Sequence, residues 1–117
     1  MGLMEEMTEL ARRAKAASRE LARLSADDKN RCLRAMADGL IEATPGLLAA
    51  NAKDLEVGKG LGLTGARMDR LGLNTDRIAA MAQGLREVAS LPEALGRVLD
   101  TRERPNALRL RKTSTPL

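Results

Sequence analysis

The stretch best suited to bind a ligand runs from Gly60 to Gly65 and reads Gly-Leu-Gly-Leu-Thr-Gly, the letters of a G-x-G-x-x-G dinucleotide fingerprint. In that motif the glycines let the backbone approach a pyrophosphate, but only where they follow a β-strand and open a helix. Here residues 47–57 are expected to be helical, and no β-branched run precedes the glycines. The favoured interpretation is a flexible connection between two helices, in which glycine ends one helix and forms the turn.

Cys32 is the single cysteine and the candidate nucleophile. A reactive thiol needs a nearby base or a cationic site, and the chain has no histidine, although Lys29 and Arg31 are close in sequence. Its place on an apolar helical face predicts a small buried residue instead. One cysteine excludes an internal disulfide, which suits a reducing cytoplasm, and one cysteine without histidine leaves only scattered carboxylates to bind a metal.

Two pairs of adjacent carboxylates, Glu5-Glu6 and Asp27-Asp28, could in principle supply an acid and a base. Each pair falls where a helix is expected to begin, and negative charge is favourable there because of the helix dipole. The six methionines recur at helical spacing, which predicts that they fill a core. The residue types alone therefore assign no catalytic, cofactor-binding or metal-binding residue.

The composition limits the kinds of protein that remain. A chain of 117 residues makes one domain at most, and without Phe, Tyr or Trp its core must consist of Leu, Ala, Met, Val and Ile. With 44% hydrophobic and 31% charged residues it is not disordered by composition. No apolar run approaches the roughly 18 residues that span a bilayer, and the first residues lack the apolar centre of a secretory signal. We therefore expect a cytoplasmic protein with no membrane partner.

The net charge of +4 comes from one segment. Residues 97–112 hold six cations and two anions, so the rest of the chain is neutral overall. A basic segment is compatible with nucleic acid, but single strands bind poorly without aromatic side chains for stacking. A solvated, partly ion-paired strand face is the favoured interpretation, and nucleic acid is an unlikely partner.

The elements that would position these residues are mainly helical. In residues 3–24, apolar positions recur every three or four residues and predict an amphipathic helix. Ser25 is the expected N-cap of a second helix that reaches about Glu42, with Asp28 as a weak partner for a capping box.

Three further helices follow. Thr44-Pro45 predicts a helix with Thr at the N-cap and Pro at the first helical position, ending near Val57. Residues 63–71 can form a short helix, and Asn74 caps another that ends before Pro92.

The predicted core consists of apolar side chains at helical spacing. Its members are Cys32, Leu33, Met36, Ala37, Leu40, Ile41, Leu47, Leu48, Ala52, Leu55, Met68, Leu71, Ile78, Met81, Ala82, Leu85 and either Val88 or Ala89. In residues 3–24 the apolar face consists of Met4, Met7, Leu10, Ala14, Ala17, Leu21 and Leu24. Helix faces suited to pack on a sheet that these residues lack are expected to form a large apolar patch in the isolated chain.

The last part of the chain changes to the alternation of a strand. Val98–Arg102 and Leu108–Lys112 are predicted to pair as a β-hairpin around the turn Arg104-Pro105-Asn106. A lone hairpin is marginal in water, so it is expected to need a partner. The predicted fold class is mainly α, with about five helices followed by a β-hairpin.

Three separated stretches carry a family resemblance: residues 27–40 (DDKNRCLRAMADGL), 50–74 (ANAKDLEVGKGLGLTGARMDRLGLN) and 109–117 (RLRKTSTPL). In order and spacing they resemble the N-terminal part of the glutamate-5-semialdehyde dehydrogenases, or gamma-glutamyl phosphate reductases, of the aldehyde dehydrogenase superfamily. The resemblance implies the N-terminal portion of an aldehyde-dehydrogenase-like α/β fold. Residues 1–92 would form a helical layer, and residues 93–117 a hairpin leading into a nucleotide-binding domain that is absent.

The resemblance also implies an activity. The family uses NADPH to reduce L-glutamyl 5-phosphate to L-glutamate 5-semialdehyde and phosphate, the second step from glutamate to proline. A cysteine far down the family's chain attacks the acyl phosphate, and hydride transfer resolves the thioester. Neither Cys32 nor Gly60–Gly65 matches a functional position of the family, so catalytic, cofactor-binding and metal residues are all expected to be none here. The chain alone is expected to be inactive and to bind no cofactor, and the full-length family is expected to be homo-oligomeric.

Two other functions stay open. A stand-alone helical interaction module without catalysis predicts cooperative folding and a defined partner. A basic nucleic-acid-binding domain built on residues 97–112 predicts binding that falls steeply with salt.

Overall fold

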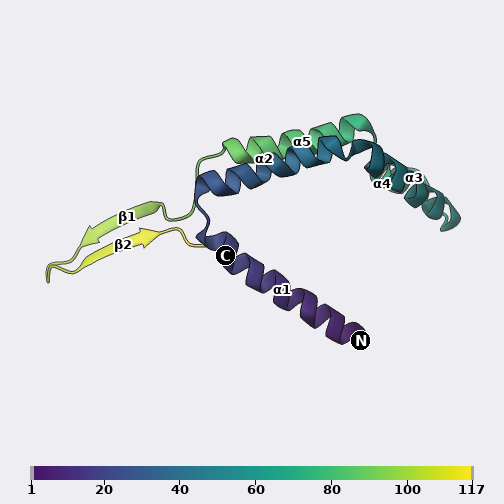
Figure 1. Cartoon of the computed structure of the whole chain (residues 1–117). Helices are drawn as coiled ribbons and strands as arrows, with labels where there is room; N and C mark the ends of the chain where they lie inside the picture. Colours follow the sequence, from purple (N-terminus) through teal and green to yellow (C-terminus); the bar gives the residue numbers. More distant parts are fainter. Residues whose placement is uncertain (1, 117) are drawn as a thin grey trace. The chain divides into compact units, whose positions relative to one another are not determined.

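The computed structural model describes residues 2–116 and contains five α-helices followed by a two-stranded antiparallel hairpin (Figure 1). The elements are α1 (Leu3–Arg23), α2 (Ala26–Glu42), α3 (Thr44–Gly60), α4 (Ala66–Leu71), α5 (Thr75–Ser90), β1 (Val98–Glu103) and β2 (Arg109–Thr113). The predicted fold class is therefore confirmed. Two compact units are present: residues 30–90 form one, and the chain up to residue 29 together with the chain from residue 91 forms the other. Within the described part of the chain, no helix combines the length and apolar character needed to cross a bilayer.

The apolar stripe of helix α1 is exposed to solvent. The exposed fraction is 79% for Met4, 49% for Met7 and 62% for Leu10, and no residue of the helix is buried. The predicted apolar face is therefore present, and its residues on the helix are exposed. Met4 and Met7, expected among the core-filling methionines, are exposed as well. The stripe consists of Met4, Met7, Leu10, Ala14, Ala17 and Leu21, all exposed, and of Leu24, half-buried just after the helix.

Two of the predicted N-caps are confirmed. The Ser25 hydroxyl accepts the Asp28 amide at 3.1 Å before α2, and the Asn74 side-chain oxygen accepts the Arg77 amide at 2.8 Å before α5. The predicted cap at Thr44 is wrong. Only Ala43 separates α2 from α3, so Thr44 is already helical, and its hydroxyl donates back to the Leu40 carbonyl at 3.1 Å.

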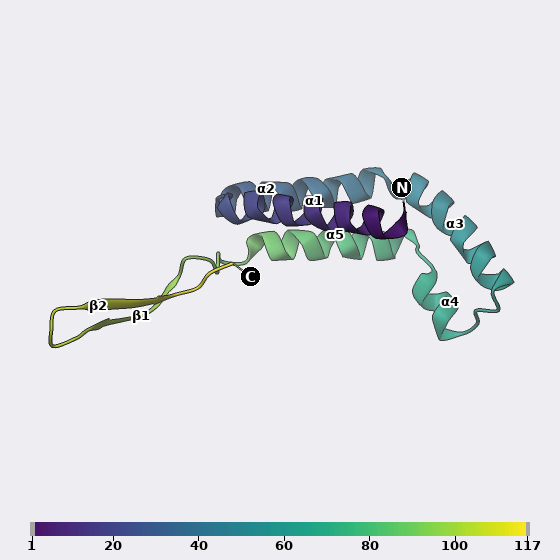
Figure 2. The ribbon, with the colours of Figure 1, turned by 90° about the horizontal axis from the view of Figure 1, so that it is seen from below.

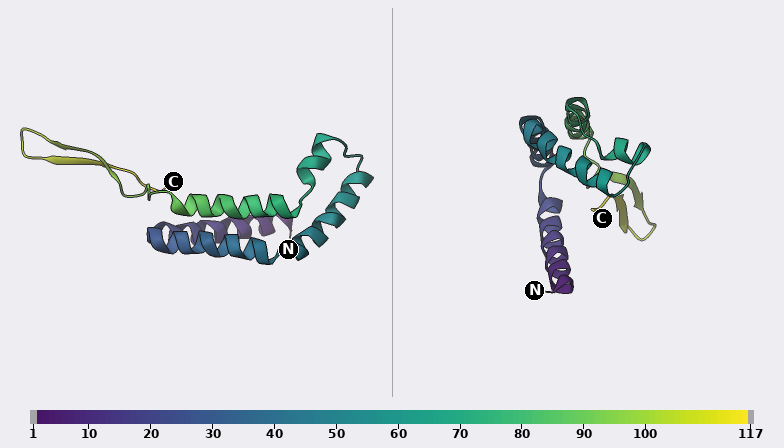
Figure 3. Two further views of the ribbon diagram at one scale, coloured as in Figure 1. Left: turned by 90° about the horizontal axis from the view of Figure 1, so that it is seen from above. Right: turned by 90° about the vertical axis from the view of Figure 1, so that its right-hand side faces the viewer.

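Helices α2 and α5 lie side by side and antiparallel (Figures 2 and 3). Ala37 of α2 and Ala82 of α5 are fully buried. Ile78 is the largest fully buried side chain among the described residues. Of the two alternatives at the end of α5, Ala89 is buried and Val88 is 52% exposed.

Other positions of the predicted core on these two helices are exposed. Exposed side chains that were predicted to be buried are Cys32, Met36, Ile41 and Met81. The predicted core is thus correct for the seam between α2 and α5 and wrong for its margins.

A buried amide organises the packing of α3. Asn51 is 6% exposed; its side-chain nitrogen donates to the Leu71 carbonyl at 2.9 Å, and its oxygen accepts the Leu73 amide at 2.8 Å. It therefore holds both ends of the turn that follows α4. Ala52, predicted to be buried, is exposed instead, while Leu55 is half-buried.

The hairpin pairs in the predicted order and is exposed throughout. Glu103 lies opposite Arg109 and Asp100 opposite Lys112, so two pairs of neighbours across the ladder have opposite charges. The ladder is irregular between Val98 and Asp100. The strands are joined by the predicted turn around Pro105.

Candidate functional site

The glycine fingerprint does not lie in the surroundings that a dinucleotide needs. Gly60 is the last residue of α3, so the motif follows a helix rather than a strand. Gly62 and Gly65 have φ angles of 78° and 55°, which is the turn-forming role predicted for them. A Cβ added at Gly60, Gly62 or Gly65 would meet nothing within 4 Å, so no close backbone approach requires these glycines. These residues do not fit a dinucleotide.

The glycine that is sterically required lies two residues earlier. A Cβ at Gly58 would come within 3.1 Å of Leu71 Cδ2, 3.2 Å of Met68 Sδ and 3.3 Å of Leu63 Cδ1. Gly58 therefore lets α4 and the preceding turn pack closely against α3.

The candidate nucleophile and the acid–base pairs are not brought together. Cys32 is exposed on α2, which corrects the prediction that it is buried. Glu5 accepts the Gly2 amide at 3.0 Å, and Asp27 and Asp28 lie in the first turn of α2, as expected for charges at helix starts. Among residues 2–116, no three His, Cys, Asp or Glu side chains are grouped closely enough to hold a metal ion.

A shallow depression runs along α1, but residues of that helix alone line it, including Leu10, Arg13 and Glu20. A hollow formed by one helix has no opposing wall and encloses no ligand. We therefore assign no binding site to it.

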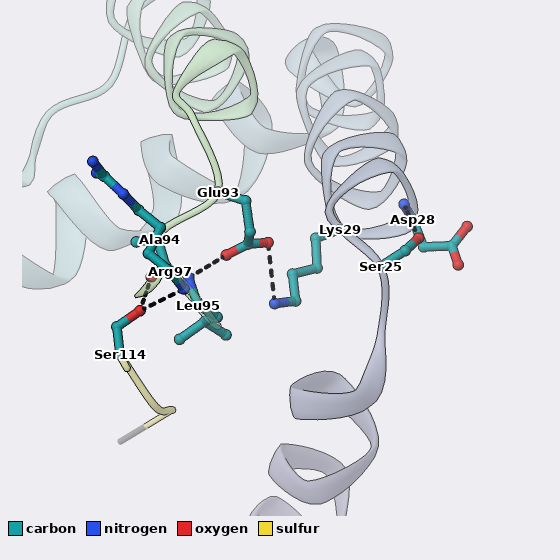
Figure 4. Close-up of polar contacts among 8 residues, drawn as sticks. All are labelled: Ser25, Asp28, Lys29, Glu93, Ala94, Leu95, Arg97 and Ser114. Carbon is teal, nitrogen blue, oxygen red and sulfur yellow. Dashed lines mark hydrogen bonds and ion pairs between the residues drawn. The ribbon is translucent and has the colours of Figure 1, made fainter. Parts of the chain in front are cut away.

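The densest long-range polar contacts lie where the hairpin begins and ends (Figure 4). Glu93 uses both carboxylate oxygens: one accepts the Leu95 amide at 3.0 Å, and the other lies 3.5 Å from Lys29 Nζ in the first turn of α2. The Ser114 hydroxyl donates to the Ala94 carbonyl and accepts the Arg97 amide at 3.2 Å. We call Lys29, Glu93 and Ser114, with the backbone of residues 94–97, the hairpin-base cluster.

The cluster favours an ionised carboxylate. The hydrogen bond from the Leu95 amide, followed by the charge of Lys29, lowers the pKa of Glu93. Because the pKa is depressed in the folded state, the stabilisation from Glu93 is present at neutral pH and is lost as the pH falls through that lowered value.

No local pattern in the sequence predicts this cluster. Lys29 and Glu93 are 64 residues apart, and Ser114 reads as an ordinary strand residue in RLRKTSTPL. A contact between such distant positions is not visible in any periodicity along the chain.

The basic C-terminal segment is solvated and partly paired, as predicted. Arg102 makes an ion pair with Asp100 at 2.8 Å on an exposed strand, and Arg109 lies opposite Glu103. Exposed cations that neighbour anions are ordinary features of an open strand.

No family model matches the chain. Curated relatives do: it is 44% identical over 116 residues to the gamma-glutamyl phosphate reductase of Allorhizobium ampelinum. It is 48% identical over 115 residues to each of the enzymes of that name from Syntrophomonas wolfei and Rhodopirellula baltica. These matches take in 98–99% of the chain, which spans only 26–27% of the length of the relatives.

Solved structures agree with the sequence relatives. The gamma-glutamyl phosphate reductase of Thermotoga maritima superposes with a TM-score of 0.90 at 30% identity, over 95% of this chain and 27% of that one. The enzyme of that name from Saccharomyces cerevisiae gives 0.84 at 30% identity, over 92% and 28%. In sequence and in fold, the chain is therefore similar to gamma-glutamyl phosphate reductases over about a quarter of their length.

Proposed function

We propose that this chain serves as the N-terminal segment of a reductase that converts L-glutamyl 5-phosphate to L-glutamate 5-semialdehyde and phosphate, with NADPH as the reductant, in proline biosynthesis. The observation that carries the proposal is the match to gamma-glutamyl phosphate reductases along nearly the whole chain, at 44–48% identity. A TM-score of 0.90 to one such enzyme agrees with it.

The proposed role of the segment is structural. Residues 1–92 would form a helical layer on the cofactor-binding domain, and residues 93–117 would form a hairpin that leads into that domain. The exposed apolar stripe of α1 supports this role, because a stripe that faces water in the chain alone is suited to burial against further protein.

The chemistry would reside in other parts of the reductase. NADPH, the acyl phosphate and the catalytic cysteine are proposed to lie outside the quarter of the enzyme that this chain matches. Cytoplasmic location and a homo-oligomeric full-length enzyme complete the proposal.

A chimera tests the proposal directly. The matching N-terminal segment of the Syntrophomonas wolfei enzyme is replaced by residues 1–117 of this chain, and the purified chimera is assayed for NADP⁺ reduction with glutamate 5-semialdehyde and phosphate. We expect turnover within about tenfold of the parent enzyme, since a tenfold loss corresponds to only about 1.4 kcal/mol of transition-state stabilisation.

Two controls make the result decisive. The 117 residues alone are expected to show no turnover, so activity of the isolated chain would contradict the proposed division of labour. A chimera with residues 3–24 in scrambled order is expected to lose activity or solubility. A chimera that is folded and soluble but inactive with the unscrambled segment would refute the reductase assignment.

A further inference from the structure

The hairpin has little apolar burial to hold it in place. Every residue of β1 and β2 is exposed, including Leu99 at 55% and Leu110 at 41%. A two-stranded hairpin with both faces in water is at best marginally stable. Contacts beyond the strand ladder are therefore decisive for whether these strands stay paired.

Ser114 provides such contacts at the open end of the hairpin. Its backbone nitrogen donates to the Arg97 carbonyl at 3.1 Å, and its carbonyl accepts the Gly96 amide at 2.9 Å. Its hydroxyl adds the two side-chain bonds to Ala94 and Arg97. Ser114, the residue directly after β2, therefore binds residues 94–97, which lead into β1.

Glu93 connects that closed base to a helix. Its carboxylate holds the Leu95 amide on one side and reaches Lys29, in the first turn of α2, on the other. Figure 4 shows the Lys29 side chain extending from the helix towards Glu93. Both side chains are partly shielded, with exposed fractions of 25% and 34%, so this ion pair is less open to solvent than the others described in the chain.

We propose that Lys29, Glu93 and Ser114 form a polar latch that fixes the base of the hairpin to the first turn of α2, so that pairing of β1 with β2 depends on that turn. The latch acts without catalysis and does not depend on the proposed reductase function. Its members are positioning residues for the hairpin.

Hydrogen exchange of the 117-residue chain tests the latch. Glu93→Gln keeps an acceptor for the Leu95 amide but removes the charge that attracts Lys29, and Lys29→Met keeps the apolar stem but removes the ammonium group. Each single variant is expected to speed exchange of ladder amides in β1 and β2 about two- to fivefold, the range that exposed ion pairs give in double-mutant cycles. The double variant is expected to exchange no faster than the faster single variant.

A second ion pair, between Asp38 and Arg86, serves as the control for the general effect of losing an ion pair. Asp38→Asn removes the charge that pairs with Arg86, at a contact that measures 3.0 Å and joins residues 48 apart within residues 30–90. It is expected to leave exchange in the hairpin unchanged. Equal effects of Asp38→Asn and Glu93→Gln on the strands would show general destabilisation and overturn the latch.

The serine is tested by restoring its hydroxyl. Ser114→Ala is expected to speed exchange of the Arg97 amide and of the ladder, and Ser114→Thr is expected to restore protection. Additive effects of Lys29→Met and Glu93→Gln would also overturn the proposal, as would strands unprotected in the unsubstituted chain.

Discussion

At the scale of single residues, the most consequential side chain is Asn51. It is a polar group in a small apolar core, and both polar atoms of its amide are used, one on the Leu71 carbonyl and one on the Leu73 amide. A satisfied buried amide fixes backbone geometry that apolar packing alone leaves free. Asn51 therefore specifies how the turn after α4 meets α3.

We predict that Asn51→Ala lowers the free energy of unfolding by about 1–3 kcal/mol, because two backbone groups lose their partner. Urea titration followed by circular dichroism at 222 nm measures the change. Gln83→Ala, at an exposed amide with one 3.5 Å contact to Glu87, is the control and is expected to change stability by less than about 0.5 kcal/mol. Equal losses of stability in the two variants would contradict the proposed role of Asn51 in fixing the turn after α4.

Residue-scale features were predictable from the sequence only where they are local. Ser25 and Asn74 act as the expected caps because a cap bonds to an amide three residues away. Thr44 fails as a cap, and Cys32 is exposed, because each outcome depends on what the neighbouring helix leaves uncovered.

At the scale of elements, the positions of the helices were predicted from the spacing of apolar residues and from the cap, glycine and proline residues at their ends. Every predicted helix and strand is present. The close packing of α3 with α4 was not foreseen, because nothing in the sequence distinguishes Gly58 from its neighbouring glycines. Gly39, in α2, is the useful contrast, since a Cβ there would meet nothing within 4 Å.

We predict opposite signs for alanine at these two glycines. Gly39→Ala is expected to stabilise the chain by about 0.5–1 kcal/mol through helix propensity. Gly58→Ala places a methyl group 3.1–3.3 Å from three side chains and is expected to lower stability by about 1–3 kcal/mol through overpacking. Thermal unfolding of both variants measures the difference. A stabilising effect of Gly58→Ala would contradict the prediction, because it would show that the neighbouring side chains can move to accommodate the methyl group.

At the scale of the whole molecule, the notable property is how little the chain buries. Fully buried apolar side chains are few, and the stripe of α1 faces solvent along its length. Sequence periodicity identified which side of α1 is apolar, but periodicity cannot say whether a partner covers it. The candidate site was equally hard to predict from the sequence. The glycine motif was correctly predicted to be a turn, but no local pattern predicted the hairpin-base cluster.

We predict that the isolated chain associates through α1. Leu10→Lys is expected to weaken association by about tenfold or more, since burial of a leucine contributes about 1.5–3 kcal/mol. Sedimentation velocity over a concentration series measures the change. Ala16→Lys adds the same charge to the same helix outside the stripe and is expected to leave association nearly unaffected; a chain that is monomeric at all concentrations would contradict the prediction.

The division of the chain into one continuous and one discontinuous unit has a consequence for its synthesis. Proteins emerge from the ribosome from the N-terminus, and continuous units fold as they emerge. Residues 30–90 form one continuous stretch that has been made in full once residue 90 is added. Lys29, in contrast, meets Glu93 only after 64 further residues have been added, and Ser114 comes later still. The helical unit can therefore be complete while the hairpin is still inside the ribosome, and closing the hairpin base is the last folding event of this stretch of chain.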